Sequence, residues 1–246
     1  MQEVRGNTQE SEHLPEPMSK EVMTEQIKSR VSRIDRELLS AFEFITSFPR
    51  SVTFFGSSRC TEGSEHYAEA RRLAKRIALE LRYTVLTGGS TGIMEAANRG
   101  AFEASGESVG INIKLPRRQG GNGYTTASID VSYFFVRKLA LLYAAEAYIL
   151  FPGGFGTLDE FFELVTLMQT RKIRRVPIFL VGKDYWQPLL RFLREDVYEI
   201  HKAVEKSDLA LYKIAESDDD IIEAIRRVPV HDGMRHRRVK ELKTTS

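Results

Sequence analysis

The stretch Tyr148-Ile-Leu-Phe-Pro-Gly-Gly-Phe-Gly-Thr-Leu-Asp-Glu160 joins a short apolar run to a glycine turn and then to the start of a helix. The apolar run ends at Pro152, three glycines follow, and Thr157 precedes two acids. Strand, glycine turn and helix start form a common phosphate-binding arrangement. Glycines let backbone N–H groups approach an anion that faces the positive end of the helix. The stretch therefore predicts a phosphate site at the end of a strand.

The expected phosphate contacts use backbone N–H groups and one hydroxyl, and they lie at Gly153, Gly154, Phe155, Gly156 and Thr157. The alternative is a helix-entry turn that needs a positive φ. One glycine would be enough for such a turn, so three glycines followed by threonine favour the phosphate.

Strand-like and helix-like segments alternate along the whole chain. This alternation predicts an α/β fold, a single Rossmann-like domain whose parallel sheet carries helices on both faces. The expected strands lie at 51–55, 83–86, 108–113, 148–151, 176–181 and 209–214, and the expected helices at 64–81, 93–104, 136–145, 157–170, 185–199 and 218–226. Residues 115–130 are expected to form a long irregular loop.

An extra helix is expected before this domain. Its apolar residues recur in steps of three or four, at Met23, Ile27, Val31, Ile34, Leu38, Phe42 and Ile45. Such a stripe packs either on the domain or against a second subunit. The expected organisation is a disordered segment at 1–18, this helix at 19–48, the nucleotide-binding catalytic domain at 49–230 and a basic flexible tail at 231–246.

Composition places the chain among soluble globular proteins. Of its 246 residues, 42% are hydrophobic and 28% are charged. No apolar run approaches the roughly 18 residues that cross a membrane. The single cysteine, Cys60, fits a reducing compartment, so we expect a cytoplasmic protein. The tail from residue 233 holds five basic residues against one acid, but the body adds no basic excess, so a nucleic-acid partner is not expected.

Two further glycine segments are expected to meet the glycine turn at the carboxyl edge of the sheet, where open α/β sheets bind ligands. They are Gly56-Ser57 and Gly88–Gly92, with Gly88 and Gly89 as candidate substrate contacts, and Asn112 near the end of the third strand is another candidate. The dinucleotide pattern G-x-G-x-x-G and the P-loop pattern are both absent. A nucleoside monophosphate or a sugar phosphate is therefore favoured as the ligand.

Glu160 is the most informative of the acids. Helical spacing places it on the stripe of Leu164 and Leu167, whereas Asp159 shares a side with Glu163 and Thr166. Acids in a first turn stabilise a helix by about 0.3–1 kcal/mol, so Asp159 is either such a dipole partner or a substrate-binding residue. A charge on an apolar flank needs a partner, so Glu160 is a candidate functional carboxylate.

Arg137-Lys138 opens the preceding helix and supplies a candidate partner. Two cations at a helix N-terminus oppose the dipole and suggest a nearby anion; a solvated pair on a charged face is the alternative, and both remain open. No histidine lies in the crevice loops and no metal-binding motif occurs. Chemistry based on carboxylate, arginine and amides suits cleavage of a glycosidic bond.

Three segments together resemble a known family: residues 92–101, residues 133–138 and the motif at 152–160. The chain resembles the LONELY GUY-type cytokinin riboside 5′-monophosphate phosphoribohydrolases, in their longer bacterial form, which are also called lysine-decarboxylase-like. The resemblance implies hydrolysis of the N-glycosidic bond of a nucleoside 5′-monophosphate to free base and ribose 5-phosphate. It further implies that the enzyme uses no cofactor and forms a homodimer or a larger homo-oligomer.

The resemblance also assigns roles to residues. It implies that Arg137 and Glu160 are catalytic, that the glycine turn holds phosphate, that Lys138 and Thr166 lie in the substrate site, and that Glu95 and Asn98 line the sugar pocket. Three positions depart from the family pattern: Ser90 replaces a glycine, Asp159 a glutamate and Arg118 a glutamate. The preferred base, adenine as in AMP or a cytokinin base, is therefore left open.

Two other functions compete with hydrolysis. Carriers of the molybdenum cofactor resemble this fold, so a non-catalytic carrier of that cofactor or of a nucleotide is one alternative. A decarboxylase is the other; it would need pyridoxal phosphate on Lys138, and no pyridoxal-phosphate motif supports it.

Overall fold

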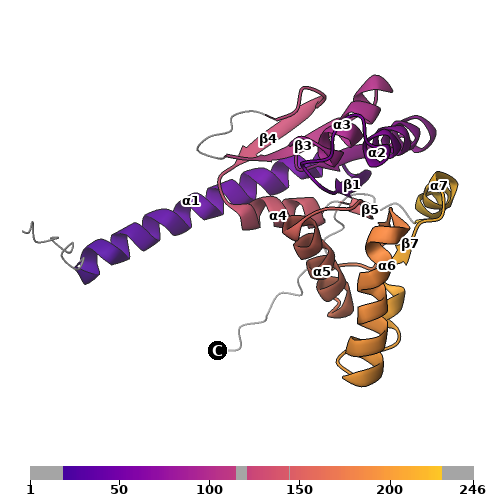
Figure 1. The fold of residues 1–246 in the computed structure, drawn as a ribbon. Coiled ribbons are helices and arrows are strands. Elements are labelled where there is room, and N and C mark those ends of the chain that lie inside the picture. The colour runs from indigo at the N-terminus through magenta and orange to yellow at the C-terminus, as the bar shows by residue number, and fades with distance from the viewer. Residues whose placement is uncertain (1–18, 115–120, 144, 229–246) are drawn as a thin grey trace, which may run out of the picture. The chain divides into compact units, whose positions relative to one another are not determined.

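A computed structural model describes residues 19–114, 121–143 and 145–228 (Figure 1). The segments predicted to be disordered or flexible, 1–18 and 231–246, lie outside the described residues, as does Arg118. The chain separates into two compact units whose boundary falls between Arg36 and Glu37. That boundary lies inside helix α1, Lys20–Thr46.

In the first unit, most apolar side chains of α1 are exposed, among them Met23, Ile27 and Val31. In the second unit, the end of the same helix packs on the core, because Ala41 and Ile45 are buried and Leu38 and Phe42 lie against the same cluster. The predicted helix at 19–48 is confirmed to within two residues.

The second unit is built on one seven-stranded sheet of order β4-β3-β2-β1-β5-β6-β7. Every neighbouring pair is parallel. The strands are β1 Ser51–Phe55, β2 Thr84–Thr87, β3 Ser108–Ile113, β4 Ala127–Val131, β5 Ala145–Leu150, β6 Ile178–Leu180 and β7 Lys213–Ile214. The predicted α/β class with a parallel sheet is confirmed.

The helices of this unit alternate with the strands. They are α2 Glu65–Arg76, α3 Ile93–Glu103, α4 Phe134–Tyr143, α5 Phe155–Gln169, α6 Lys183–Phe192 and α7 Asp218–Arg226. α2 continues into a π-helical turn at Ile77–Leu81, and α6 into another at Leu193–Ile200. Ser64 and Ser217 cap α2 and α7, because each hydroxyl accepts a backbone N–H of the first turn.

Side chains of each strand alternate between two hydrophobic clusters, as the two-residue period of a strand requires. In β5, Ala147 and Ile149 face the cluster that α2, α3 and α7 cover, whereas Tyr148 and Leu150 face the cluster that α4, α5 and α6 cover. Figure 1 shows α2 and α3 side by side on their face. Both faces of the sheet are therefore covered at its centre, which explains why every residue of β1, β2 and β5 is buried.

Two predicted segments are wrong in detail. The loop predicted at 115–130 contains β4, an edge strand whose alternate residues are exposed, so it lacks the continuous apolar run of a central strand. The strand predicted at 209–214 begins as a 3₁₀ turn, Asp208–Ala210, and only Lys213–Ile214 pair with β6.

The sheet order places a switch point beside β1. The chain leaves β1 toward β2 on one side, and it returns with β5 on the other side. Such a point opens a crevice between diverging loops at the carboxyl edge. The loops after β1 and β5 are those that hold Gly56-Ser57 and the glycine turn.

Candidate active site

The loops on the two sides of the switch point are joined by backbone hydrogen bonds. Ser57 donates its N–H to the Pro152 carbonyl at 3.0 Å, and its carbonyl accepts the Ile93 N–H at 3.1 Å. A Cβ added to Gly56 would lie 2.7 Å from Cγ1 of Ile93, which explains that glycine by packing. These bonds hold the loop after β1, the start of α3 and the loop after β5 together.

The glycine turn does not fit the alternative that it needs a positive φ. α5 begins at Phe155 with Gly154 as its N-cap at φ −93°, and none of the three glycines has a positive φ. A Cβ on Gly153 would lie 2.1 Å from Oγ1 of Thr157, but a Cβ on Gly154 or Gly156 would meet nothing within 4 Å. Neither a backbone torsion nor side-chain packing requires glycine at Gly154 and Gly156. Because no side chain stands there, the backbone at the positive end of α5 borders open space.

The neighbours of the turn differ in exposure. The Phe155 side chain is 93% exposed, whereas Thr157 is only 5% exposed. Tyr185 of α6 donates its hydroxyl to the Gly153 carbonyl at 2.7 Å. The turn is therefore anchored on its carbonyl side and open on its other side.

Arg137 reaches across the ends of two strands. Its Nε donates to the Ile111 carbonyl and its Nη2 to the Gly88 carbonyl, both at 2.8 Å. Burial lowers the pKa of the guanidinium, and the nearby Glu160 carboxylate opposes that shift. A Cβ on Gly88 would lie 1.7 Å from Nη2, so only glycine leaves room for this arginine.

Glu160 lies in the second turn of α5, one turn later than the first-turn position predicted, because the helix begins at Phe155. Its side chain is half-buried. Burial raises the pKa of Glu160 to about 7, although the cations Arg137 and Lys138 lower it. No hydrogen bond or ion pair between described residues includes this carboxylate, since Arg137 and Lys138 bind other groups. A half-buried carboxyl whose pKa is raised toward neutrality is a candidate catalytic group.

Lys138 is held by two carboxylates of α5. Its Nζ lies 2.5 Å from Asp159 and 2.7 Å from Glu163. Desolvation lowers the pKa of Lys138, but the two carboxylates outweigh it and the net pKa is raised. The predicted pairing of Asp159 and Glu163 on one side of the helix is confirmed. Of the two alternatives for Arg137-Lys138, the nearby anion is the one that the structure shows, because Asp159 and Glu163 bind Lys138 and the Glu160 carboxylate acts on Arg137.

The two asparagines predicted in the site differ sharply. Asn112 donates its amide to Asp130 at 2.9 Å, and its Oδ1 is buried beside Gly89, without a hydrogen-bond partner in the described part of the chain. Asn98 is 0% exposed and its side chain bonds to Thr87, Ser108 and Asn122. The Asn98 amide thus ties the strand ends together from within, and its place beside a sugar stays a prediction.

Two other predicted residues remain accessible. Glu95 of α3 accepts a hydrogen bond from the Tyr67 hydroxyl at 2.9 Å, and burial together with Glu95 raises the pKa of Tyr67 to about 12. Thr166 lies exposed on α5, beyond Glu163. Their roles in substrate binding stay predictions, as do those of Gly88 and Gly89, which are buried.

The residues that support the site could not be found from motifs. Tyr67, Tyr185 and Asn122 belong to no motif in the sequence. The hydroxyl of a tyrosine at a buried helical position was the one available signal, because such a group needs a hydrogen-bond partner.

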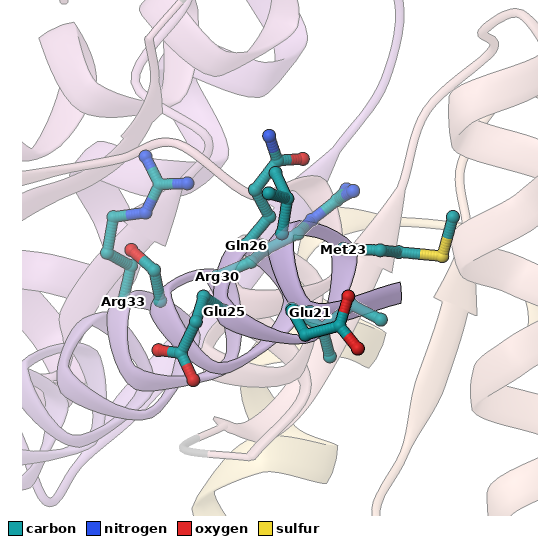
Figure 2. A pocket seen from close by; sticks show the side chains of 9 residues that line it. Glu21, Met23, Glu25, Gln26, Arg30 and Arg33 are labelled. Carbon is teal, nitrogen blue, oxygen red and sulfur yellow. The ribbon is translucent and has the colours of Figure 1, made fainter. Parts of the chain in front are cut away.

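A cavity of about 780 Å³ lies beside the first part of α1, and Figure 2 shows the side chains that line it. All the residues that line it belong to this one helix, between Glu21 and Arg33. One helix cannot enclose a small molecule, so this cavity is not the candidate site. Within the described residues, no group of three or more His, Cys, Asp or Glu side chains is arranged to hold a metal ion. No described helix combines the length and apolarity needed to cross a membrane.

Comparison with known proteins identifies the family of the chain. The family model described as "Possible lysine decarboxylase" matches residues 94–225. The chain is 33% identical over 156 residues to the probable cytokinin riboside 5′-monophosphate phosphoribohydrolase LOGL5 of Oryza sativa subsp. japonica, and the match spans 62% of each chain, less than two thirds of the rice protein. It is 31% identical over 154 residues to the probable cytokinin riboside 5′-monophosphate phosphoribohydrolase LOG6 of Arabidopsis thaliana. That match spans 62% of this chain and 76% of the relative.

Among solved structures, the molybdenum cofactor binding protein from Rippkaea orientalis shares the fold, with a TM-score of 0.53 and 24% identity over 72% of this chain and 93% of the other. At that identity the likeness concerns the fold alone. The family model covers more than half of the chain, and it includes Arg137 and Glu160. The chain therefore belongs to the family described as possible lysine decarboxylases, which is the family of the cytokinin riboside 5′-monophosphate phosphoribohydrolases.

Proposed function

We propose that this protein hydrolyses the N-glycosidic bond of a nucleoside 5′-monophosphate and releases the free base and ribose 5-phosphate. The observation that carries the proposal is the half-buried Glu160 carboxylate, whose pKa is about 7, beside the Arg137 guanidinium and just after the open glycine turn. The names of the relatives, cytokinin riboside 5′-monophosphate phosphoribohydrolases, support the same reaction.

The geometry suggests how the reaction would run. The phosphate would occupy the open space beside Gly154 and Gly156, where it meets backbone N–H groups and the positive end of α5. The sugar would then lie toward Glu160, which is one to two turns further along the helix. As the C1′–N bond breaks, positive charge develops on the sugar, and a carboxylate stabilises this charge or directs water to C1′. Water gives its oxygen to C1′, and the base leaves with the bonding electrons and takes up a proton.

The finer substrate preference is part of the proposal. AMP and cytokinin riboside 5′-monophosphates share the phosphate and the ribose that this site addresses, so both are candidate substrates. The test is to incubate the purified protein with AMP, isopentenyl-AMP and other monophosphates and to measure free base. No base release from the whole panel would exclude the reaction.

A variant then tests the role of Glu160. Glu160→Gln keeps the size of the side chain but removes the carboxylate, so we expect kcat to fall about a hundredfold or more. Glu43→Gln is the matched control, because Glu43 is an exposed acid on α1. Full activity in Glu160→Gln would exclude the catalytic role.

The carrier alternative rests on the fold likeness to a molybdenum cofactor binding protein. A carrier would copurify with a fluorescent pterin and release no base. A pterin-free protein that releases base would exclude this alternative.

The decarboxylase suggested by the family description does not fit Lys138. A lysine that forms a Schiff base must act as a neutral amine, but Lys138 is held as a cation by Asp159 and Glu163, and its pKa is raised. We therefore derive no step through pyridoxal phosphate.

We further propose a homodimer or a larger homo-oligomer. Large apolar side chains are exposed on α4 and α5, including Phe134, Leu139 and Phe162, and such side chains suit a subunit interface. Analytical ultracentrifugation tests this proposal, and a monomer at micromolar concentration would contradict it. The cytoplasmic location stays a prediction.

A further inference from the structure

The entry to α4 is held by a carboxylate from a distant part of the chain. Oε1 of Glu37 accepts the backbone N–H of Ser132 at 2.8 Å and that of Tyr133 at 2.9 Å. Glu37 lies on α1, 95 residues before Ser132, and both groups belong to the second compact unit. Two charge-assisted hydrogen bonds to one carboxylate oxygen fix the direction in which the chain enters the helix.

Tyr133 connects this carboxylate to Arg137. The Tyr133 carbonyl accepts the backbone N–H of Arg137 at 3.1 Å, the first hydrogen bond of α4. Glu37 is therefore linked to the backbone of Arg137 through Tyr133 alone. Glu37 accepts the Tyr133 N–H, and the Tyr133 carbonyl accepts the Arg137 N–H. The other end of Arg137 is held by the carbonyls of Ile111 and Gly88.

The charges at this end of α4 fit the same role. Arg137 and Lys138 lie near the positive end of the helix dipole, which disfavours cations there. The Glu37 carboxylate places a negative charge at that end. It therefore interacts favourably with the positive end of the dipole and favours a helix that begins at this point.

We propose that Glu37 is a positioning residue for the active site: it fixes the start of α4 and thereby holds Arg137 where it faces Glu160. The inference rests on the proposed function and deepens it, because it makes the helix before the catalytic domain part of the catalytic apparatus. Glu37 acts through Arg137 and does not touch the substrate.

Two variants and one control test this role. Glu37→Ala removes the acceptor, and we expect kcat for AMP to fall about tenfold while KM changes less than about twofold, because a misplaced group costs rate rather than ground-state binding. Glu37→Gln keeps an oxygen that accepts both N–H groups, so we expect it to recover most of the lost kcat. Glu43→Ala, an exposed acid of the same helix, should match the wild type.

A pH profile separates positioning from simple loss of stability. The groups around Glu160 are Arg137 and Lys138 of α4 and Asp159 and Glu163 of α5. If α4 loses its fixed start, the cations of α4 lower the pKa of Glu160 less, so the kcat profile of Glu37→Ala should move to higher pH. Wild-type kcat and an unmoved profile in Glu37→Ala would overturn the proposal.

Hydrogen exchange provides a readout that does not depend on activity. In Glu37→Ala, and less in Glu37→Gln, the amides of Ser132, Tyr133 and Arg137 should exchange faster than in the wild type, whereas the amides of α2 should not. Unchanged exchange at α4 would overturn the proposal even if the wild type releases no base. Absence of base release in the wild type with faster exchange at α4 would instead overturn only the proposed function.

Discussion

Glu160 makes the clearest prediction at the scale of single residues. Its pKa is about 7 because burial outweighs Arg137 and Lys138. If the ionised carboxylate stabilises the sugar cation or directs water, kcat should fall as the pH drops through about 7. The measurement is kcat at saturating AMP between pH 5 and 9, since free substrate phosphate also titrates near pH 6. A kcat that rises toward acid pH would show instead that the protonated form is active.

Gly88 carries the second prediction at this scale. A Cβ there would lie 1.7 Å from the Nη2 of Arg137, so Gly88→Ala must displace the guanidinium. We expect kcat/KM to fall more than about tenfold while circular dichroism stays unchanged. Gly63→Ala is the matched control, because a Cβ at Gly63 meets nothing within 4 Å. Equal activity of the two variants would contradict the importance of the Arg137 position.

Residue roles could be predicted from the sequence where they follow from helical spacing. The shared side of Asp159 and Glu163 follows from the period of the helix, and Lys138 does lie between them. The carbonyl partners of Arg137 could not be predicted, because Gly88 and Ile111 contribute backbone atoms that any sequence possesses. For the same reason the sequence could not show that the Asn98 amide is used within the core.

At the scale of elements, the glycine turn depends on α6. Tyr185 donates its hydroxyl to the Gly153 carbonyl, which fixes the peptide plane that leads into the open part of the turn. In Tyr185→Phe we expect KM for AMP and Kd for ribose 5-phosphate to rise about three- to tenfold, with a smaller change in kcat, since one hydrogen bond contributes about 1 kcal/mol. Kinetics and calorimetry measure the two constants. A change in kcat alone would contradict a role in phosphate binding.

Most helices and strands could be predicted because their hydrophobic pattern continues over several residues. α3, β1 and β3 lie within a residue of their expected bounds. β4 was missed because an edge strand with alternate exposed residues resembles a loop at the level of composition. The length of β7 was overestimated, because apolar residues in and beside a 3₁₀ turn give the same sequence pattern as a strand.

At the scale of the whole molecule, Glu160 also makes the stability depend on pH. Its pKa is raised from 4.5 to about 7 on folding. Its contribution to the free energy of unfolding is therefore fully present below about pH 4.5 and is lost as the pH rises through 7. Glu160→Gln removes the titrating carboxyl. The difference in the free energy of unfolding between this variant and the wild type should therefore increase between pH 5 and pH 8, by up to roughly 3 kcal/mol in favour of the variant. Urea unfolding at the two pH values measures the difference. Glu43→Gln should show no such change, and an equal change in both variants would contradict the assignment.

The class of the fold could be predicted from the alternation of strands and helices, but the order of the strands could not. The register of β1 between β2 and β5 depends on contacts between distant segments, which no local pattern records. The same holds for Glu37, whose partners lie 95 and 96 residues away. Long-range pairing therefore sets both the position of the crevice and the support of Arg137.

The position of β1 between β2 and β5 has a consequence for the protein during its synthesis. β1, β2 and β3 leave the ribosome first and bring with them the carbonyls of Gly88 and Ile111 that await Arg137. Arg137 and Glu160 follow only with α4 and α5, after the whole first half of the sheet. In the nascent chain these two carbonyls therefore lack their Arg137 partner until α4 has been synthesised, and Glu160 is added only later, with α5.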